Sequence, residues 1–181
     1  MNYANIKTFD IANGPGVRIS LFVSGCRHGC KGCFNKEAQS FKYGKIFNKN
    51  VEDNIIKQLN SPLIDGLSLL GGEPLEPENQ KVLLPFIQRV KKESPSTNIW
   101  LWTGFTFEDI LNDSRANTPE IQTILETIDV LVDGPFIEEE KDITLRFRGS
   151  KNQRILDSKE SIKHQYPITW HDDKFFETHS M

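Results

Sequence analysis

Long apolar runs, an excess of positive charge and a secretory leader are all missing from this sequence, and each absence excludes a class of protein. No stretch approaches the roughly 18 to 20 apolar residues of a membrane helix, and the first ten residues lack the basic start and apolar core of a signal peptide. Lysine and arginine number 22 against 25 aspartate and glutamate, so the net charge is −3 and nucleic-acid binding is disfavoured. We expect a cytoplasmic protein that uses neither membrane nor nucleic acid.

Several common catalytic motifs are also absent. The sequence has no G-x-x-x-x-G-K-[ST] phosphate loop, no G-x-S-x-G elbow and no H-E-x-x-H helix, so kinase, serine hydrolase and metalloprotease functions lack support. What is present is enough apolar material for one core, because 181 residues include 12 Phe and 3 Trp. A chain of this length is close to one typical domain, so we expect residues 1–181 to form a single domain.

Strand and helix patterns alternate along the chain. Short stretches rich in β-branched and aromatic residues predict strands at 17–23, 66–70, 98–103, 129–133 and 143–147. Apolar residues at helical spacing predict helices at 51–59, 79–92, 106–111 and 118–128. The last of these has Thr118 as a cap and Pro119 at its first helical position. This order predicts an α/β fold of mainly parallel strands with helices outside, either an open sheet or a partial (β/α) barrel.

Candidate site residues follow four of the predicted strands. In α/β folds, ligands bind at the carboxyl ends of the parallel strands. A cysteine cluster follows the first predicted strand, and Gly71-Gly72-Glu73-Pro74 follows the second. Thr103-Gly104 follows the third, and Asp133-Gly134-Pro135 follows the fourth. We expect these four loops to meet at one site.

The three cysteines of the chain, Cys26, Cys30 and Cys33, lie within eight residues of one another in a glycine-rich loop. An odd, tightly spaced set is a poor disulfide framework and a good metal site. Thiolates suit zinc or an iron-sulfur cluster, whereas magnesium and calcium prefer oxygen ligands.

The fourth ligand separates these two metals. A structural zinc site is normally closed by four protein ligands, here His28, His164, His171 or His179 beside the cysteines. Three cysteines alone suit an iron-sulfur cluster whose remaining iron stays open to a substrate. The spacing favours the cluster over zinc, and we expect His28 to be an exposed loop residue.

The C-x3-C-x2-C spacing resembles the cysteine motif of the radical S-adenosylmethionine enzymes. Residues 13–18 (NGPGVR) and 32–35 (GCFN) are similar to the glycyl-radical-activating branch, in particular the members that act on anaerobic ribonucleoside-triphosphate reductase. Residues 71–75, 133–136 and 148–154 resemble segments of that branch in the same order. The resemblance spans residues 4–170 and leaves 171–181 unassigned.

This resemblance implies a cofactor, a reaction and a partner. The three thiolates would hold a 4Fe-4S cluster that reduces S-adenosylmethionine to methionine and a 5′-deoxyadenosyl radical. That radical would remove hydrogen from a glycine of the reductase, with electrons from a donor such as a flavodoxin. No protein acid or base is needed beyond the cluster ligands. The implied contacts to S-adenosylmethionine are Gly32, Cys33, Phe34, Gly71, Gly72 and Glu73.

A Gly-Gly pair after a strand is also an ordinary turn, and the basic residues Arg146, Arg148 and Arg154 also suit a solvated edge strand. One of these arginines could instead meet the cofactor carboxylate or the partner. Two other functions stay open. The first is activation of another glycyl radical enzyme, of the pyruvate formate-lyase type. The second is a non-enzymatic module that holds zinc or an electron-transfer cluster.

Overall fold

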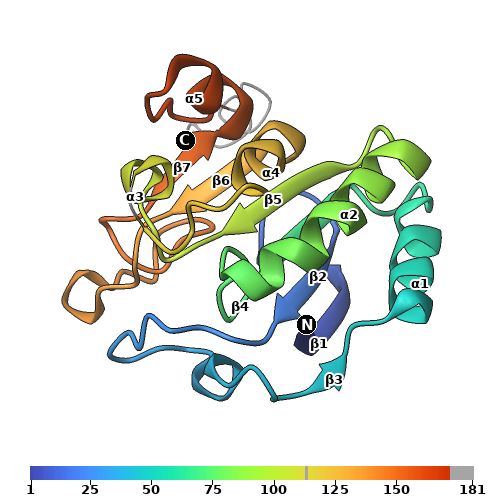
Figure 1. Cartoon of the computed structure of the whole chain (residues 1–181), viewed down its shortest axis with the longest axis horizontal. Helices are drawn as coiled ribbons and strands as arrows, with labels where there is room; N and C mark the ends of the chain where they lie inside the picture. Colours follow the sequence, from blue (N-terminus) through green and yellow to red (C-terminus); the bar gives the residue numbers. More distant parts are fainter. Residues whose placement is uncertain (113, 172–181) are drawn as a thin grey trace.

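The computed structural model describes residues 1–112 and 114–171, and the strands within them form one mixed sheet (Figure 1). The order across the sheet is β3-β1-β2-β4-β5-β6-β7, so β3 and β7 are its edges. The strands are β1 (Asn2–Asp10), β2 (Arg18–Val23), β3 (Lys45–Ile46), β4 (Gly66–Gly71), β5 (Asn98–Trp102), β6 (Val130–Asp133) and β7 (Arg154–Asp157).

The four central strands, β2, β4, β5 and β6, run parallel to one another. The other pairs, β1 with β2, β1 with β3 and β6 with β7, are antiparallel. The α/β class is therefore confirmed, but the expectation of mainly parallel strands holds only for the centre of the sheet. Its antiparallel margins arise because β1 and β7 join their neighbours through loops instead of helical crossovers.

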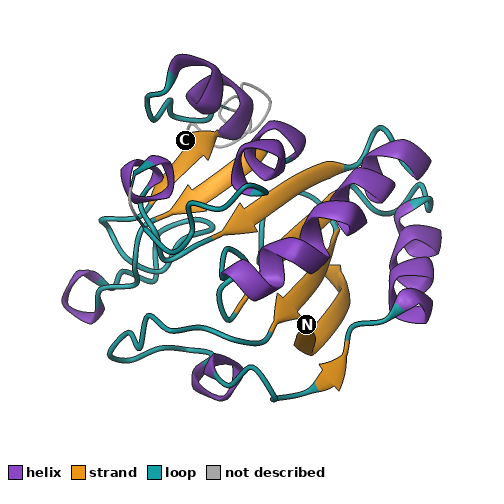
Figure 2. Cartoon of the chain, viewed as in Figure 1, coloured by secondary structure: helices purple, strands orange, loops and turns teal. Residues whose placement is uncertain are grey.

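Helices α1, α2 and α4 cover one face of the sheet (Figure 2). Their apolar residues recur at helical spacing and pack with the side chains that β2, β4 and β5 direct to that face, in one continuous core. The helices are α1 (Lys49–Leu59), α2 (Pro77–Glu93), α3 (Phe107–Leu111), α4 (Ile121–Thr127) and α5 (Ser158–His164), with 3-10 turns at Lys36–Gln39 and Glu138–Glu140. None of the described helices is long and apolar enough to cross a membrane.

The opposite face of the sheet carries a second, aromatic cluster. Trp100, Val130 and Val132 are fully buried there, and Trp102, Phe147, Ile155 and Trp170 pack against them. Trp100 contacts Phe147 and Trp170 edge-on, at ring-centroid distances of 5.5 and 4.9 Å. The sheet is thus buried on both sides in its centre, as expected where parallel strands dominate.

Arg18 joins the amino-terminal ends of the parallel strands, away from the predicted site. Its buried guanidinium donates to the Ser68 hydroxyl at 2.7 Å and to the carbonyls of Leu67 and Asn98 at 2.9 and 3.1 Å. Burial lowers its pKa to about 10, so it remains a cation at neutral pH. The side chain therefore connects β2, β4 and β5, and no carboxylate of the described residues pairs with it directly.

Two local predictions are wrong. Residues 143–147 form turns instead of a strand, because Phe147 has a left-handed backbone (φ 59°) and turns its ring onto Trp100. The helix predicted from residue 118 begins at Ile121. The Thr118 hydroxyl donates instead to the side chain of Gln80, at 2.6 Å.

Candidate iron-sulfur site

The four predicted loops leave the same end of the sheet, where the parallel strands β2, β4, β5 and β6 reach their carboxyl termini (Figure 1). Hydrogen bonds connect these neighbouring loops to one another. The Glu73 backbone N–H donates to the Gly25 carbonyl at 2.9 Å, which joins the loop after β4 to the cysteine loop. The Gly134 N–H donates to the Phe105 carbonyl at 2.8 Å, which joins the loops after β6 and β5. The predicted convergence is confirmed.

The cysteine loop, residues 25–35, is half-buried and folds through several left-handed glycines. Gly25 has φ +100° and lies against the ring of Phe41, which also stacks under the Arg27 guanidinium at 4.3 Å. Burial raises the pKa of the Cys26 thiol to about 11, and nearby carboxylates add to the effect. Cys26 is therefore protonated at neutral pH until a metal displaces the proton.

The Glu73 carboxylate is 1% exposed and has four hydrogen-bond partners. One carboxylate oxygen accepts from the Leu75 N–H at 2.8 Å and the Thr103 hydroxyl at 2.9 Å. The other accepts from the Gly104 N–H at 2.7 Å and lies 2.9 Å from Nε2 of His28. The carboxylate thus links the loops after β2, β4 and β5, and four protein partners already occupy its oxygens.

Gly72 lets the cysteine loop approach the end of β4. A Cβ at this position would lie 2.7 Å from the Gly25 carbonyl oxygen and 2.8 Å from that of Ala38. Its N–H donates to the Val23 carbonyl, at 2.8 Å. Its own carbonyl accepts no hydrogen bond from the described residues.

A second buried carboxylate, Glu76, binds the same loop and was missed by the sequence analysis. It is 0% exposed and accepts the Arg27 backbone N–H at 2.8 Å and the Arg27 guanidinium at 2.6 Å. Nε of Arg115 lies 3.1 and 3.2 Å from its two oxygens. These partners are 49 and 39 residues away in the chain, which is why no local pattern reveals them.

The second half of the cysteine loop has fewer contacts. The Cys33 N–H donates to the Cys30 carbonyl at 3.2 Å, and Lys31 pairs at 3.2 and 3.1 Å with the exposed carboxylates of Glu138 and Glu139. Phe34 is 96% exposed, next to the last cysteine. This half therefore lies at the surface of the site.

The basic segment 148–154 supports the loop after β6. Arg154 binds the fully buried Asp133 at 3.0 Å and Glu108 at 2.6 Å. Arg148 donates to the Gln153 carbonyl at 2.7 Å, while Arg146 is exposed and its guanidinium lies 5.2 Å from the Phe147 ring centroid. The edge-strand interpretation is wrong for Arg146 and Arg148, because residue 146 lies in a bend and residue 148 in a loop, whereas Arg154 does lie on the edge strand β7.

The donor set of the loop, three thiols, fits an iron-sulfur cluster. Three thiols come from one loop, and the buried hydroxyl of Ser24, two residues before Cys26, has no hydrogen-bond partner among the described residues. In residues 1–112 and 114–171 no three His, Cys, Asp or Glu side chains are gathered as metal ligands. The thiols would therefore have to move together around a cluster.

The histidines proposed as a fourth zinc ligand have other positions. The expectation of an exposed His28 is wrong, because its side chain is 15% exposed and faces Glu73. His164 lies on α5 with its Nε2 3.3 Å from Glu160, and His171 is exposed. His179 lies outside the described residues.

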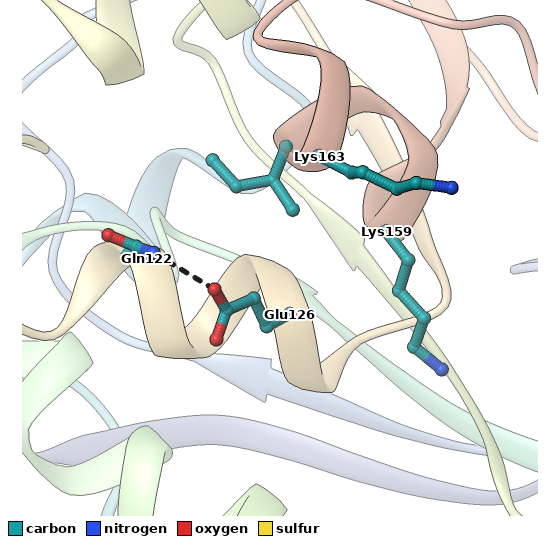
Figure 3. Close-up of a pocket in the computed structure, with 5 residues that line it drawn as sticks. Gln122, Glu126, Lys159 and Lys163 are labelled. Atoms are coloured by element: carbon teal, nitrogen blue, oxygen red, sulfur yellow. Dashed lines mark hydrogen bonds between the residues drawn. The ribbon is translucent and has the colours of Figure 1, made fainter.

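One surface hollow lies elsewhere, between α4 and α5 (Figure 3). It has a volume of about 430 Å³ and is lined by Gln122, Glu126, Lys159, Ile162 and Lys163. Both lysines are paired, Lys159 with Asp129 at 2.6 Å and Lys163 with Glu160 at 3.2 Å. Both cations of the hollow are thus already paired, and we assign no chemistry to it.

Comparison with known proteins supports the iron-sulfur assignment. Residues 12–156 match the family model described as a 4Fe-4S single cluster domain. A protein of Haemophilus influenzae is 46% identical over 86% of this chain and 97% of its own length. One of Vibrio cholerae is 48% identical over the same shares, and one of enterobacteria phage T4 is 37% identical over 90% and 97%. All three are named anaerobic ribonucleoside-triphosphate reductase-activating protein. No solved structure matches the chain.

Proposed function

This chain belongs to the family of anaerobic ribonucleoside-triphosphate reductase-activating proteins, and from this premise we propose that it cleaves S-adenosylmethionine reductively to place a glycyl radical on such a reductase. One observation carries the proposal. The three-cysteine loop of a 4Fe-4S family is bonded directly to the Gly71–Glu73 turn, at the carboxyl ends of four parallel strands. A cluster and a small ligand bound there would be neighbours.

Cys26, Cys30 and Cys33 would hold the cluster, which when bound supplies the electron that cleaves the sulfonium. The Gly72 carbonyl would accept a hydrogen bond from the ammonium group of S-adenosylmethionine. Gly32, Cys33 and Phe34 would contact the same ligand. The Glu73 carboxylate contributes indirectly, because its oxygens already bind protein donors.

We further propose that this chain functions as a partial barrel and that the reductase covers the open side of that barrel. A full (β/α)8 barrel needs about 250 residues, so this 181-residue chain is too short to close one. A one-electron donor such as a flavodoxin would supply the reduced cluster. The proposed place of action is the cytoplasm.

The proposal is tested anaerobically. The protein is reconstituted with iron and sulfide, then given S-adenosylmethionine and a strong reductant, and 5′-deoxyadenosine and methionine are measured together. We expect both products from the wild type and neither from Cys26→Ala, Cys30→Ala or Cys33→Ala. With anaerobic ribonucleotide reductase present, we expect a glycyl radical signal in electron paramagnetic resonance.

The same assay separates the alternatives. A protein that carries a reduced 4Fe-4S cluster but forms neither product, even with the reductase present, contradicts the proposal. Radical formation on pyruvate formate-lyase and not on the reductase would show a different target. Tight binding of a single zinc, with no cluster formed, would support the non-enzymatic module.

A further inference from the structure

The two residues that follow the first cysteine each bind a buried carboxylate of one neighbouring segment. Arg27 binds Glu76 and His28 binds Glu73, and these carboxylates are 0% and 1% exposed. Both acids lie between the end of β4 and the start of α2. The interval between Cys26 and Cys30 is therefore attached twice to a rigid part of the fold.

The His28 attachment combines a hydrogen bond with close packing. Its Nε2 lies 2.9 Å from Oε2 of Glu73, and its ring meets Phe105 edge-on at 4.4 Å. Gly104 makes room for the imidazole, because a Cβ there would lie 2.7 Å from its Cδ2. Because three other donors fix the orientation of the Glu73 carboxylate, the hydrogen bond to it also fixes the position of the His28 ring.

The Arg27 attachment involves the backbone as well as the side chain. Oε1 of Glu76 accepts the Arg27 backbone N–H at 2.8 Å, and Oε2 accepts its guanidinium at 2.6 Å. Arg115 fixes the same carboxylate and stacks over Phe105 at 4.6 Å. Phe105 thus contacts both His28 and Arg115, and the two attachments share one support. Charge-assisted hydrogen bonds to buried carboxylates are among the stronger ones in proteins.

Residues 29–34, which carry Cys30 and Cys33, have no comparable side-chain support among the described residues. Their side-chain pairs, from Lys31 to Glu138 and Glu139, join groups that are 76%, 42% and 69% exposed, and such surface pairs contribute little to stability. The next attachment is Asn35, whose side-chain amide donates to the Gly71 carbonyl at 3.2 Å. The loop is therefore fixed at residues 26–28, tied again at Asn35, and weakly held between them.

We propose that Glu73 and Glu76 are positioning residues that, through His28 and Arg27, fix residues 26–28 before the cluster binds, while residues 30–34 close around it. The inference rests on the proposed function in assuming that this loop holds a cluster. Preorganising one ligand and the adjoining turn reduces the conformational entropy lost on metal binding. It also keeps the cluster in register with the Gly71–Glu73 turn.

Backbone amide exchange in the metal-free, full-length protein tests the proposal without cluster chemistry. We expect the Arg27 amide to exchange at least about tenfold more slowly than the amides of Lys31 and Gly32. His28→Ala and Glu76→Gln should each remove about tenfold of that protection. His28→Gln should restore most of it, because its amide can still donate to Glu73.

Glu78→Gln is the matched control. Glu78 also binds Arg27, at 3.0 Å, but its side chain is 52% exposed. This variant should keep the wild-type protection, and thermal melting should show that all four variants fold. Equal exchange rates at Arg27 and Gly32 in the wild type would overturn the proposal, as would equal effects of Glu76→Gln and Glu78→Gln.

A second measurement reads the cluster itself. Iron bound after reconstitution and the electron paramagnetic resonance spectrum of the reduced cluster should change in His28→Ala and Glu76→Gln and return towards wild type in His28→Gln. Unchanged iron content and spectra in the first two variants would contradict the positioning role. A protein that shows the amide protection but never cleaves S-adenosylmethionine would contradict only the proposed function, so the two failures are distinguishable.

Discussion

At the scale of single residues, the site depends on close contacts between backbones. Gly72 is the clearest case, because its Cα faces two carbonyl oxygens, of Gly25 and Ala38, that the fold cannot easily move. Both carbonyls are already engaged, since they accept the N–H groups of Glu73 and Gly25. A side chain at residue 72 would therefore separate the cysteine loop from β4.

We predict that Gly72→Ala loses about 1–3 kcal/mol of unfolding free energy, the usual cost of overpacking, together with most of its bound iron. Chemical denaturation and iron analysis after reconstitution measure the two effects. Gly149→Ala is the control, because the nearest atoms to its Cβ would be in the side chains of Phe136, at 3.1 Å, and Gln153, at 3.6 Å, neither of which belongs to the cysteine loop. Normal iron content in Gly72→Ala would show that the loop tolerates the displacement.

Residue-level prediction from sequence goes furthest where the chemistry is local. The spacing of Cys26, Cys30 and Cys33 predicts an iron-sulfur cluster, and the match to a 4Fe-4S family supports that choice of metal, while the assignment of these three thiols as its ligands stays a prediction. Glu76 and the true position of His28 are not found, because each depends on a partner at least 39 residues away. A buried carboxylate is visible only after the strands place its donors around it.

At the scale of elements, Asp129 directly precedes β6 and connects that strand to α2, α5 and β5. Its carboxylate accepts from Lys91 of α2 at 2.7 Å, from Lys159 of α5 at 2.6 Å and from the Ile99 N–H of β5 at 2.8 Å. Burial acts to raise its pKa, but these three donors outweigh burial and the pKa is lowered from 3.8. The carboxylate is therefore more acidic in the folded than in the unfolded chain.

This shift has a defined pH dependence. A lowered carboxyl pKa stabilises the folded state fully above about pH 4 and progressively less as the pH falls through the folded pKa. We predict that Asp129→Asn costs about 2 kcal/mol at pH 7 and that the difference from wild type narrows below about pH 4. Urea denaturation at several pH values measures it. A difference that stays constant down to pH 2 would contradict the assignment.

Arg154 connects β7 to the start of α3 through Asp133 and Glu108. The fully buried Asp133 carboxylate also accepts the N–H of Phe107, the first residue of α3, at 2.7 Å. We predict that Arg154→Ala costs about 2 kcal/mol, less than a fully buried pair would, because Arg154 is 38% exposed. The double variant Arg154→Ala/Asp133→Asn should recover part of the loss, since it leaves no unpaired buried charge. Denaturation curves with no recovery would mean that another contact dominates.

Prediction of strands and helices from the sequence succeeds for the parallel centre of the sheet and fails for its antiparallel margins. The four central strands and α1 to α4 are found because burial on both sides or on one stripe gives a strong apolar pattern. The outer, antiparallel strands β1, β3 and β7 are missed because they are largely exposed or very short. Residues 143–147 are wrongly predicted as a strand because they have a strand-like apolar pattern, whereas Phe147 packs against the aromatic cluster from irregular backbone.

At the scale of the whole molecule, the candidate site lies at the carboxyl-terminal end of the parallel strands and is built from loops. The cysteine loop and the segment 134–153 both extend from that end of the sheet (Figure 1), and Lys31 connects them through ion pairs with Glu138 and Glu139. The weakly held half of the cysteine loop and the exposed Phe34 lie beside the proposed cluster. A radical formed here would need further cover to exclude water and oxygen, and a large protein substrate can supply it.

We therefore predict that intact reductase is a far better substrate than its glycine segment alone. Short glycine peptides should gain the radical, or lose hydrogen to 5′-deoxyadenosine, at least about a hundredfold less efficiently than the whole reductase, because remote binding energy is lost. Deuterium at the glycine Cα and its appearance in 5′-deoxyadenosine measure productive transfer. Uncoupled cleavage of S-adenosylmethionine serves as the control that the cofactor site itself works. Peptides that react as fast as intact reductase would show that the chain already encloses its site, and the partial barrel would then need no protein lid.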